Sequence, residues 1–552
     1  MGQAVRGERP VQFSWDKFSP AGAESELWDV IVIGAGMGGG TVGYSLARKG
    51  FKVLFLERGS APTLFPQSFE EGRLKRILGL ERPEDRLTAM GRWPRRFTIM
   101  RDGQAVDFLA PMGSGPGGSS AIYGAGLERM RRIDFSASSH PEGEPGPMRD
   151  DWPVSFDEFK KHYEEAEKLF EVVGTRDPDD PDDDTTLTAP PALSQRDQDF
   201  FDSFQALGMK PYRVHVGIGY RPGCRECIGL PCPTDCKADG ASKAACPAVR
   251  DHGAKIILNC EVERLEATDG RVTSVEARTA EGTIKLRGRI VVLAAGALST
   301  PLLLRKSVSP GWPNGIGNQN DLVGRGLMFH ASDLIALWPR KNVSSAGPRK
   351  TLSSRAFYAV NGRKFGSLQS LGLPVSHGAI FDFLMSRIER ASVRIPLMRH
   401  AVRAVSLTAA TYFKRACVFA TIIEDFPYHS NRVVVDPSKP SGFYIEYTKS
   451  RELVERVAMM RAMLKSALAV HKPWILTGDD NLNMGHPSGT CRFGSDPATS
   501  VLDPSNKVWN VENLYVADAS FFPSSAGANP ALTVAANALR VAESIANQLA
   551  SA

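Results

Sequence analysis

Two short stretches near the C-terminal end of the chain carry residue types that can do acid–base chemistry. The first reads HPSGTCRFG over residues 486–494 and contains His486, and the second reads GANPALT over residues 527–533 and contains Asn529. A neutral imidazole can accept a proton near neutral pH, and an amide can donate a hydrogen bond that orients the same substrate atom. Since a lone histidine is more often a core residue with satisfied hydrogen bonds, the surrounding elements must decide its role.

A nucleotide-binding signature lies near the N terminus. A short apolar run at residues 30–33 predicts a buried parallel strand, and it leads into a G-x-G-x-x-G pattern formed by Gly34, Gly36 and Gly39. These glycines allow, in turn, a tight turn, the approach of a pyrophosphate and close helix–strand packing. The next strand ends at Glu57, where an acid is expected to accept hydrogen bonds from a ribose.

Two later segments extend the predicted nucleotide site. The segment 288–304 reads as a strand that runs into the small residues 294–297, which can pass close to a dinucleotide. The segment 513–523 reads as another strand, ending at Asp518, where an acid could bind a polar ligand chain. A site assembled from both ends of the chain fits a large cofactor that is held permanently, and this favours FAD over NAD.

In these motifs the sequence resembles the glucose–methanol–choline (GMC) oxidoreductases, a family of flavoenzymes. The matching stretches follow one another along most of the chain: GAGMGGG with Glu57, GSGPGGSSAIYGAGLERM at 113–130, VVLAAGALSTPLLL at 291–304, VGRGLMFH at 323–330, HPSGTCRFG at 486–494 and the segment 513–545. Residues 331–480 match poorly, as expected for a region that faces the substrate.

The resemblance implies an α/β (α+β) fold, in which a Rossmann-like FAD-binding domain is interleaved with a substrate or cap domain built on an antiparallel sheet. We expect the FAD-binding domain at 27–145, 216–330 and 484–552. We expect the substrate domain at 146–215 and 331–483, after an N-terminal extension of residues 1–26.

By the same resemblance His486 is the catalytic base and Asn529 its partner. The residues expected at the cofactor are Gly34, Gly36, Gly39, Glu57, Gly117, Gly118, Ser119, Ser120, Val262, Ala295, Gly296, Asp518, Ala519 and Pro530. No histidine lies in 113–126, so we expect FAD to be noncovalent. His330 is interpreted as structural, and Tyr123 stands where many members have Asn.

A cysteine cluster reads C-x2-C-x4-C-x3-C and comprises Cys224, Cys227, Cys232 and Cys236. Closely spaced thiolates in a loop can bind an iron–sulfur cluster or zinc. The stretch resembles the cluster-binding loop of bacterial membrane-linked FAD glucose dehydrogenases, but Glu226 replaces one of their cysteines. A metal-free or disulfide-bearing loop is the alternative, and it is favoured over the cluster.

Bulk properties exclude some classes of partner. The 552-residue chain has a net charge of +6 that is not gathered into a basic block, which argues against a nucleic-acid binder.

With neither a secretory signal nor an apolar run that could span a bilayer, the chain is expected in the cytoplasm. The basic segment 385–416 could contact a membrane surface peripherally, although an ordinary cap helix is favoured. The acidic segment 176–194 reads as a solvated loop.

The sequence therefore predicts an FAD-dependent oxidoreductase that oxidises a CH–OH group of a small alcohol, polyol or sugar by hydride transfer to flavin N5. Electrons are expected to pass to a non-oxygen acceptor such as a quinone or a cytochrome. The alternatives are an oxidase that uses O₂, a non-redox FAD-containing lyase and a non-catalytic subunit. The substrate and the oligomeric state stay open.

Overall fold

The structure is a computed structural model. It describes residues 15, 18–63, 83–101, 103–109, 111–136, 148, 150–234, 236–373, 380–381, 384–385, 388, 398–479 and 481–551. Most of the expected N-terminal extension and much of the segment 385–416 therefore lie outside the described residues.

The first of two large sheets is mixed and has a parallel centre. Its strands run in the order β6-β2-β1-β9-β8-β7, and β21 pairs with β9. The central strands β1, β2, β6, β9 and β21 pair in parallel, whereas β7, β8 and β9 form an antiparallel meander. The bounds are β1 (Leu27–Ile33), β2 (Val53–Glu57), β6 (Lys255–Leu258), β7 (Glu261–Thr268), β8 (Arg271–Thr279), β9 (Gly282–Leu293) and β21 (Leu514–Val516).

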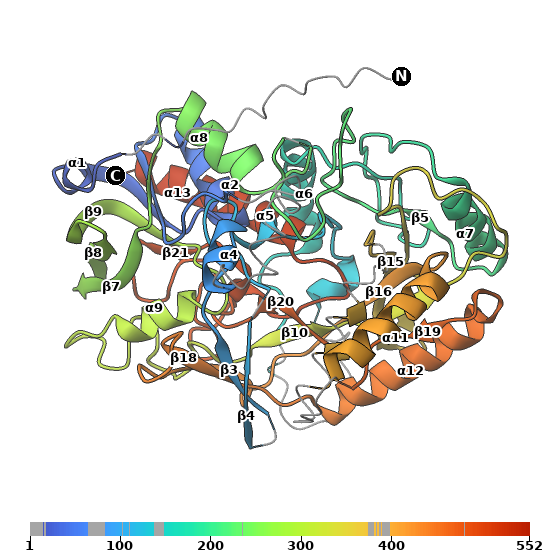
Figure 1. Ribbon diagram of the computed structural model, residues 1–552. Helices are drawn as coiled ribbons and strands as arrows, with labels where there is room; N and C mark the ends of the chain where they lie inside the picture. The colour runs from blue at the N-terminus through green and yellow to red at the C-terminus, as the bar shows by residue number, and fades with distance from the viewer. Residues whose placement is uncertain are drawn as a thin grey trace.

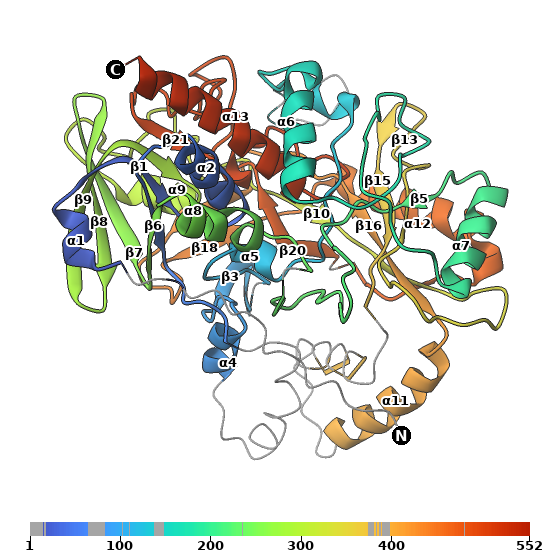
Figure 2. The same ribbon diagram turned by 90° about the horizontal axis from the view of Figure 1, so that it is seen from above.

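Burial on both faces explains why the predicted strand at 30–33 is continuously apolar. Val30 and Val32 of β1 pack in one core cluster with residues of α2 (Met37–Arg48), α8 (Cys246–Asp251) and α13 (Ala531–Ala550). Ile31 and Ile33 belong to the cluster on the opposite face. Figure 2 shows α2, α8 and α13 together beside this sheet. Helix α2 begins at Met37, directly after Gly36, so the glycine-rich turn between β1 and α2 is short.

The second large sheet is antiparallel throughout and carries most of the substrate side. Its strands run in the order β19-β11-β16-β15-β12-β5, and β10 joins β16 and β20. The bounds are β5 (Tyr212–Arg213), β10 (Met328–Ala331), β11 (Leu334–Leu337), β12 (Leu352–Ser354), β15 (Gly366–Ser370), β16 (Cys417–Ile423), β19 (Trp474–Ile475) and β20 (Leu482–Ser488). Figures 1 and 2 both show this sheet beside the first one.

The alternation of side chains gives the second sheet one core face and one cavity face. Phe419 of β16 points toward α7 (Gln195–Ala206) and α12 (Arg451–Ala467), with which it shares a core cluster. Its neighbours Ala420 and Ile422 point the other way and line the large cavity. The sheet therefore forms one wall of the candidate site.

The remaining elements are shorter. A four-stranded sheet has the order β17-β18-β3-β4, and β13 and β14 form a hairpin. The strand bounds are β3 (Phe97–Arg101), β4 (Gln104–Phe108), β13 (Ala359–Val360), β14 (Arg363–Lys364), β17 (Arg432–Val435) and β18 (Phe443–Glu446). The other α-helices are α1 (Pro20–Glu24), α4 (Pro83–Ala89), α5 (Gly118–Ala121), α6 (Phe156–Leu169), α9 (Thr300–Lys306) and α11 (Met398–Phe413).

The acidic segment 176–194 is a surface loop, as its composition predicts, but two of its acids are not solvated. Asp177 and Asp183 are buried, and Asp177 lies 2.8 Å from the guanidinium of Arg131. Arg132 pairs with Asp182 of the same segment at 3.0 Å. Composition does not reveal these ion pairs, because the arginines that form them lie about fifty residues away in the sequence.

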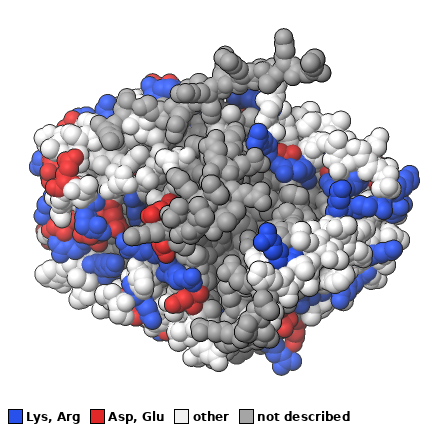
Figure 3. All heavy atoms as spheres, in the orientation of Figure 1, with Lys and Arg blue, Asp and Glu red and all other residues white. Residues whose placement is uncertain are grey.

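The part of the segment 385–416 that the structure describes includes helix α11, which exposes apolar side chains. Val405, Leu407 and Tyr412 are more than half exposed, at 57%, 54% and 59%. Charged side chains on the right of Figure 3, where Figure 1 places α7, α11 and α12, are mostly basic. Among the described residues no helix is both long and apolar enough to cross a membrane. Contact of α11 with a membrane surface stays a prediction.

Candidate active site

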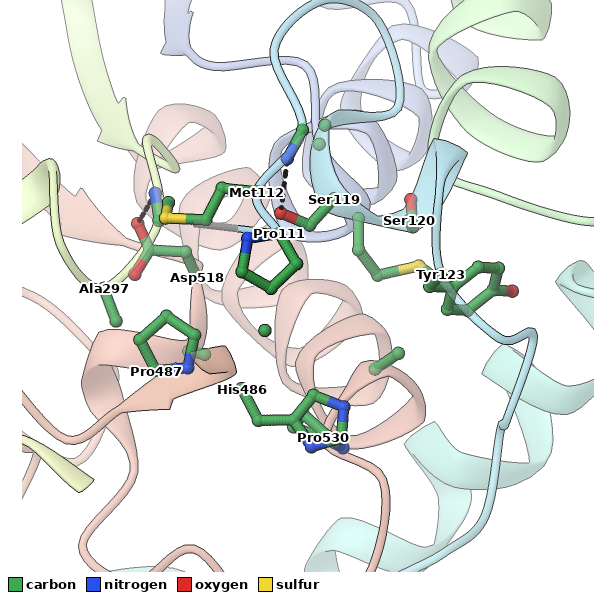
Figure 4. A pocket seen from close by; sticks show the side chains of 18 of the residues that line it. Pro111, Met112, Ser119, Ser120, Tyr123, Ala297, His486, Pro487, Asp518 and Pro530 are labelled. Carbon is green, nitrogen blue, oxygen red and sulfur yellow. Dashed lines mark hydrogen bonds between the residues drawn. The ribbon is translucent and has the colours of Figure 1, made fainter. Parts of the chain in front are cut away.

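A large cavity lies between the carboxyl ends of the parallel strands and the cavity face of the antiparallel sheet. Its volume is about 640 Å³, within the usual range of ligand pockets. His486 and Asn529 both line it, and so do all the residues expected at the cofactor except Gly39 and Gly117. Figure 4 shows His486 and Ser119 on opposite sides of this cavity. The fold thus brings residues from both ends of the chain to one site.

The turn between β1 and α2 leaves room for a ligand at one glycine and fills it at two others. A Cβ at Gly36 would meet no atom closer than 3.9 Å, so the space beside it is open. A Cβ at Gly39 would lie 2.0 Å from the carbonyl oxygen of Gly34, and one at Gly38 would lie 1.7 Å from that of Ala517. Helix α2 has no side-chain cap, so its first N–H groups can bind phosphate in the open space.

The carboxylate of Glu57 organises this end of the cavity. Its Oε2 accepts a hydrogen bond from the backbone N–H of Ala35 at 3.0 Å. Its Oε1 accepts from the N–H groups of Gly59 and Gly115 at 2.9 and 3.0 Å. Glu57 therefore joins three glycine-rich turns, in addition to the ribose contact that the sequence predicts for it.

Asp518 joins the ends of three other segments in the same way. Its Oδ2 accepts from the backbone N–H of Gly296 at 2.9 Å and from the hydroxyl of Thr300, while its Oδ1 accepts from the N–H and the hydroxyl of Ser520. Burial raises the pKa of this carboxyl, and the four donors oppose that effect. Asp518 lines the cavity, but its oxygen atoms are already engaged by the chain.

The loop before α5 closes the cavity over the first glycine turn. Gly118, Ser119 and Ser120 line the cavity, whereas Gly117 lies behind it and donates its N–H to the carbonyl oxygen of Ala35 at 2.8 Å. Ser119 accepts from the N–H of Gly113 at 3.1 Å, as Figure 4 shows. The open space at Gly36, the uncapped N terminus of α2 and this loop together fit the size and the charge of FAD.

His486 has a partner that the sequence did not indicate. Strand β20 carries His486 and pairs with β10, which carries His330. The two Nδ1 atoms lie 3.0 Å apart. The Nε2 of His330 faces the carbonyl oxygens of Ala526 and Ser525 at 2.9 and 3.1 Å, so it must carry a hydrogen. His330 is thus more than a structural residue.

This arrangement sets the tautomer of His330 and favours the Nδ1–H tautomer of His486, in competition with the amide nitrogen of Asn483, which lies 3.3 Å from the same Nδ1. Burial lowers the pKa of His330, so its ring is neutral and its Nδ1 is an acceptor. In this tautomer His486 donates from Nδ1 to His330, which leaves a lone pair on its Nε2. Within the described part of the chain Nε2 makes no hydrogen bond. Burial above all, together with the electrostatic effects of His330 and Lys350, holds the pKa of His486 well below its ordinary value.

Asn529 is oriented by a residue of the antiparallel sheet. Its Oδ1 accepts a hydrogen bond from Nε2 of Gln369 at 2.9 Å. The amide nitrogen of Asn529 is therefore the group that can donate to a ligand. Gly126 packs against the same amide, since a Cβ there would lie 2.7 Å from Oδ1. A buried contact on each side holds the Asn529 side chain in one position.

The cysteine loop lies beside the cavity and comes together in pairs. The Cys227 side chain hydrogen-bonds to Cys232, which lowers the pKa of Cys232 to about 5. Cys224 contacts Cys236. In the part of the chain that the structure describes, no group of three or more His, Cys, Asp or Glu side chains could hold a metal ion. An iron–sulfur cluster at this loop stays a prediction.

Buried Lys237 anchors the cysteine loop to the cavity wall. Its ammonium donates to the carbonyl oxygens of Ala121, Cys227 and Leu230, and burial lowers its pKa to about 8. Tyr123 lies over this ammonium and donates its hydroxyl hydrogen to the carbonyl oxygen of Ala238 at 2.5 Å. Tyr123 also lines the cavity, so it both packs and shapes the site.

Comparison with known proteins identifies the family. The GMC oxidoreductase N-terminal model matches residues 29–332, and the C-terminal model matches residues 427–538. The chain belongs to the GMC oxidoreductase family, which acts on CH–OH donors and uses FAD. The expected fold class is thereby confirmed, as is the prediction of an oxidoreductase.

The relatives include both oxidases and dehydrogenases. Paromamine 6'-oxidase of Streptomyces fradiae is 27% identical over 96% of this chain and 93% of its own. The 2-methyl-1,2-propanediol dehydrogenase of Mycolicibacterium austroafricanum is 25% identical over 94% of this chain and 95% of its own. Pyridoxine 4-oxidase from Mesorbium loti has the same fold, with a TM-score of 0.61 at 19% identity over 94% of this chain and 99% of its own.

Proposed function

We propose that the protein oxidises a CH–OH group of a small alcohol, polyol or sugar, with His486 as the base and Asn529 as the orienting donor. The observation that carries the proposal is the 3.0 Å contact between the Nδ1 atoms of His330 and His486, which favours one tautomer of His486. That tautomer leaves a basic lone pair on Nε2 inside the cavity that also holds the Asn529 amide. FAD, when bound, accepts the hydride from the substrate carbon.

The side chains of the protein bind the substrate oxygen and accept its hydroxyl proton. Asn529 donates its amide N–H to the substrate oxygen and sets the direction of the carbon–hydrogen bond. Nε2 of His486 takes the hydroxyl proton, and the positive charge that the ring gains is shared with His330 through the Nδ1–Nδ1 hydrogen bond. The substrate leaves as a carbonyl compound, having lost one hydride and one proton.

Helix α13 contributes a fixed positive end to the same site. It begins at Ala531, directly after Pro530, and has no side-chain cap. Pro530, Ala531 and Val534 line the cavity. The partial positive charge at the start of this 20-residue helix favours negative charge placed against it. Such charge develops on a cofactor that receives a hydride.

We further propose that FAD is held without a covalent bond and that the electrons pass to a non-oxygen acceptor. Support for the acceptor comes from the paired cysteines, which lie next to the cavity, in a loop that could relay electrons. An iron assay of the purified protein, together with an absorbance shoulder near 400–420 nm, would detect a cluster. Rapid reoxidation of the reduced flavin by O₂ would instead make the protein an oxidase.

The proposed function is tested by a flavin spectrum before and after anaerobic addition of a panel of alcohols, polyols and sugars. Bleaching of the oxidised flavin bands by one class supports the proposal and identifies that class. A flavin that no member of the panel bleaches contradicts it and favours the non-redox lyase or a non-catalytic subunit.

A further inference from the structure

A second charged side chain, Lys350, lines the cavity at its catalytic end. Lys350 precedes β12 and is only 4% exposed. Its ammonium donates to the carbonyl oxygen of Gly124 at 2.8 Å, and no carboxylate of the described residues lies within salt-bridge distance of it. An ammonium has three hydrogens to donate, so two remain for a ligand.

The carboxylates nearest to Lys350 are engaged elsewhere. Glu226 accepts from the backbone N–H groups of Arg349 and Lys350 at 2.8 and 3.1 Å. Glu128 pairs with Arg355 at 3.0 Å and accepts from the hydroxyl of Tyr212 at 2.9 Å. Neither of them lies within salt-bridge distance of the Lys350 ammonium, although both oppose the effect of burial, which lowers its pKa to about 8; at neutral pH the cavity therefore contains a buried cation without a direct counter-ion.

Other buried lysines of the protein have ammonium groups that make two or more polar contacts. Lys364 lies 2.9 Å from both Asp134 and Glu424. Lys237 donates to three carbonyl oxygens. An uncompensated buried charge is costly, and an opposite charge that binds beside it lowers this cost. The single bond made by Lys350 therefore marks a site that a ligand completes.

Two further polar atoms in the cavity also have no partner. The Oε1 of Gln369 and the hydroxyl of Ser332 are buried, make no hydrogen bond among the described residues and belong to side chains that line the cavity. Gln369 is 2% exposed, and its Nε2 already holds Asn529. An amide oxygen needs a donor, and a hydroxyl group of a ligand supplies one.

The position of Lys350 relative to the catalytic pair follows from a short series of contacts. Lys350 contacts Gly124, and Gly126, two residues on, packs against the Asn529 amide. The positive charge of Lys350 is also one of the causes that lower the pKa of His486. The cation and the candidate base therefore act on the same part of the cavity.

We propose that Lys350 binds a carboxylate of the substrate, while Gln369 and Ser332 bind its hydroxyl groups, so that the preferred substrate is a polyhydroxy acid. The inference rests on the proposed function and names its substrate class. A carboxylate fits better than a phosphate, because a single ammonium lies here without the several cations and N–H groups of phosphate sites. Cationic amino alcohols are disfavoured by the same charge.

The experiment compares three three-carbon alcohols that differ in charge: glycerate, glycerol and 2-amino-1,3-propanediol. Anaerobic flavin reduction is followed in the holoenzyme, in Lys350→Met, in Lys350→Gln and in the control Lys341→Met. Lys341 is an exposed lysine on the same stretch of chain. Lys350→Gln keeps a neutral donor for Gly124, so it separates the loss of charge from a loss of packing.

The wild-type holoenzyme is expected to prefer glycerate to glycerol and glycerol to the amino alcohol. Both Lys350 variants should raise KM for glycerate about 10- to 100-fold, which corresponds to the loss of a charge-assisted hydrogen bond, and should change kcat less. Lys341→Met should leave all three substrates unchanged. Equal KM values for glycerate in wild type and in both Lys350 variants would overturn the inference.

A binding measurement separates this inference from the proposed function. Propanoate has no hydroxyl group, so it cannot react, and its binding is read from the change in the flavin spectrum. Lys350-dependent binding of propanoate supports the anion site even if no alcohol reduces the flavin. A Lys350 variant that shifts the flavin midpoint potential but leaves propanoate binding unchanged would assign Lys350 to the flavin and refute the substrate role.

Discussion

Replacement of His330 by phenylalanine removes the group that holds the tautomer of His486. The aromatic ring keeps the shape of the side chain, but the acceptor that lies 3.0 Å from Nδ1 of His486 is lost. Nδ1–H of His486 is then left without its partner in a buried place. The amide nitrogen of Asn483 lies 3.3 Å from Nδ1 of His486, and it can donate to Nδ1 only when the ring proton is on Nε2 instead. In that tautomer Nε2 has no lone pair with which to accept the substrate proton.

The expected loss follows from the cost of leaving a buried N–H unpaired, about 1–3 kcal/mol. If the productive tautomer is disfavoured by that amount, flavin reduction at saturating alcohol slows about 5- to 150-fold. His330→Gln is the matched control, because its amide can accept from His486 and donate to Ala526. It should stay within a few-fold of wild type.

Anaerobic stopped-flow absorbance measures the rate, and FAD content and thermal unfolding show whether each variant is folded. A folded His330→Phe variant that reduces its flavin as fast as wild type would refute the tautomer argument. Equal losses in the Phe and Gln variants would show that His330 acts by packing and not by its hydrogen bonds.

Three further predictions concern the glycine-rich turn after β1, the pH dependence of kcat/KM and the side-chain amide of Asn529. Gly36→Ala should fold but bind FAD weakly, because its Cβ enters the open space expected to hold the cofactor. Gly38→Ala should not fold, because its Cβ would lie 1.7 Å from a carbonyl oxygen. FAD content tests the first variant, and circular dichroism tests the second. The acid limb of kcat/KM should lie below pH 6.5, because a lowered pKa keeps His486 neutral as pH falls through 6.5; a limb above 6.5 would contradict the assignment. Gly126→Ala should slow flavin reduction about 10- to 100-fold by displacing Asn529, and unchanged single-turnover rates would argue against that contact.

The nucleotide half of the fold was predictable because its determinants are local. The run at 30–33, the glycines after it and Glu57 lie within thirty residues, and each has one physical role in a strand–turn–helix unit. His486 and Asn529 were found by resemblance to family motifs. Their placement in one cavity depends on the antiparallel sheet, in which β20 carries His486 and Gln369 of β15 holds Asn529, and these are contacts between residues far apart in the sequence.

The substrate half was not predictable because its residues meet through the antiparallel sheet. Gln369 and Lys350 lie in the region that resembled the family least, and each reaches the cavity from a different strand or loop. The ion pairs of the acidic loop 176–194 were not predictable for the same reason, since its acids pair with arginines that are distant in the sequence. His330 stood in a recognised motif, and the alternation of β10 and β20 was the signal that could have linked it to His486.

The central claim is that Nε2 of His486 takes the substrate proton. The most direct measurement is anaerobic flavin reduction by the preferred alcohol in wild type and in His486→Ala, with FAD content matched. Our account predicts a rate about 100- to 10,000-fold lower in the variant, the range for loss of a general base, with partial rescue by added imidazole. A FAD-loaded His486→Ala variant that is reduced at the wild-type rate would contradict it.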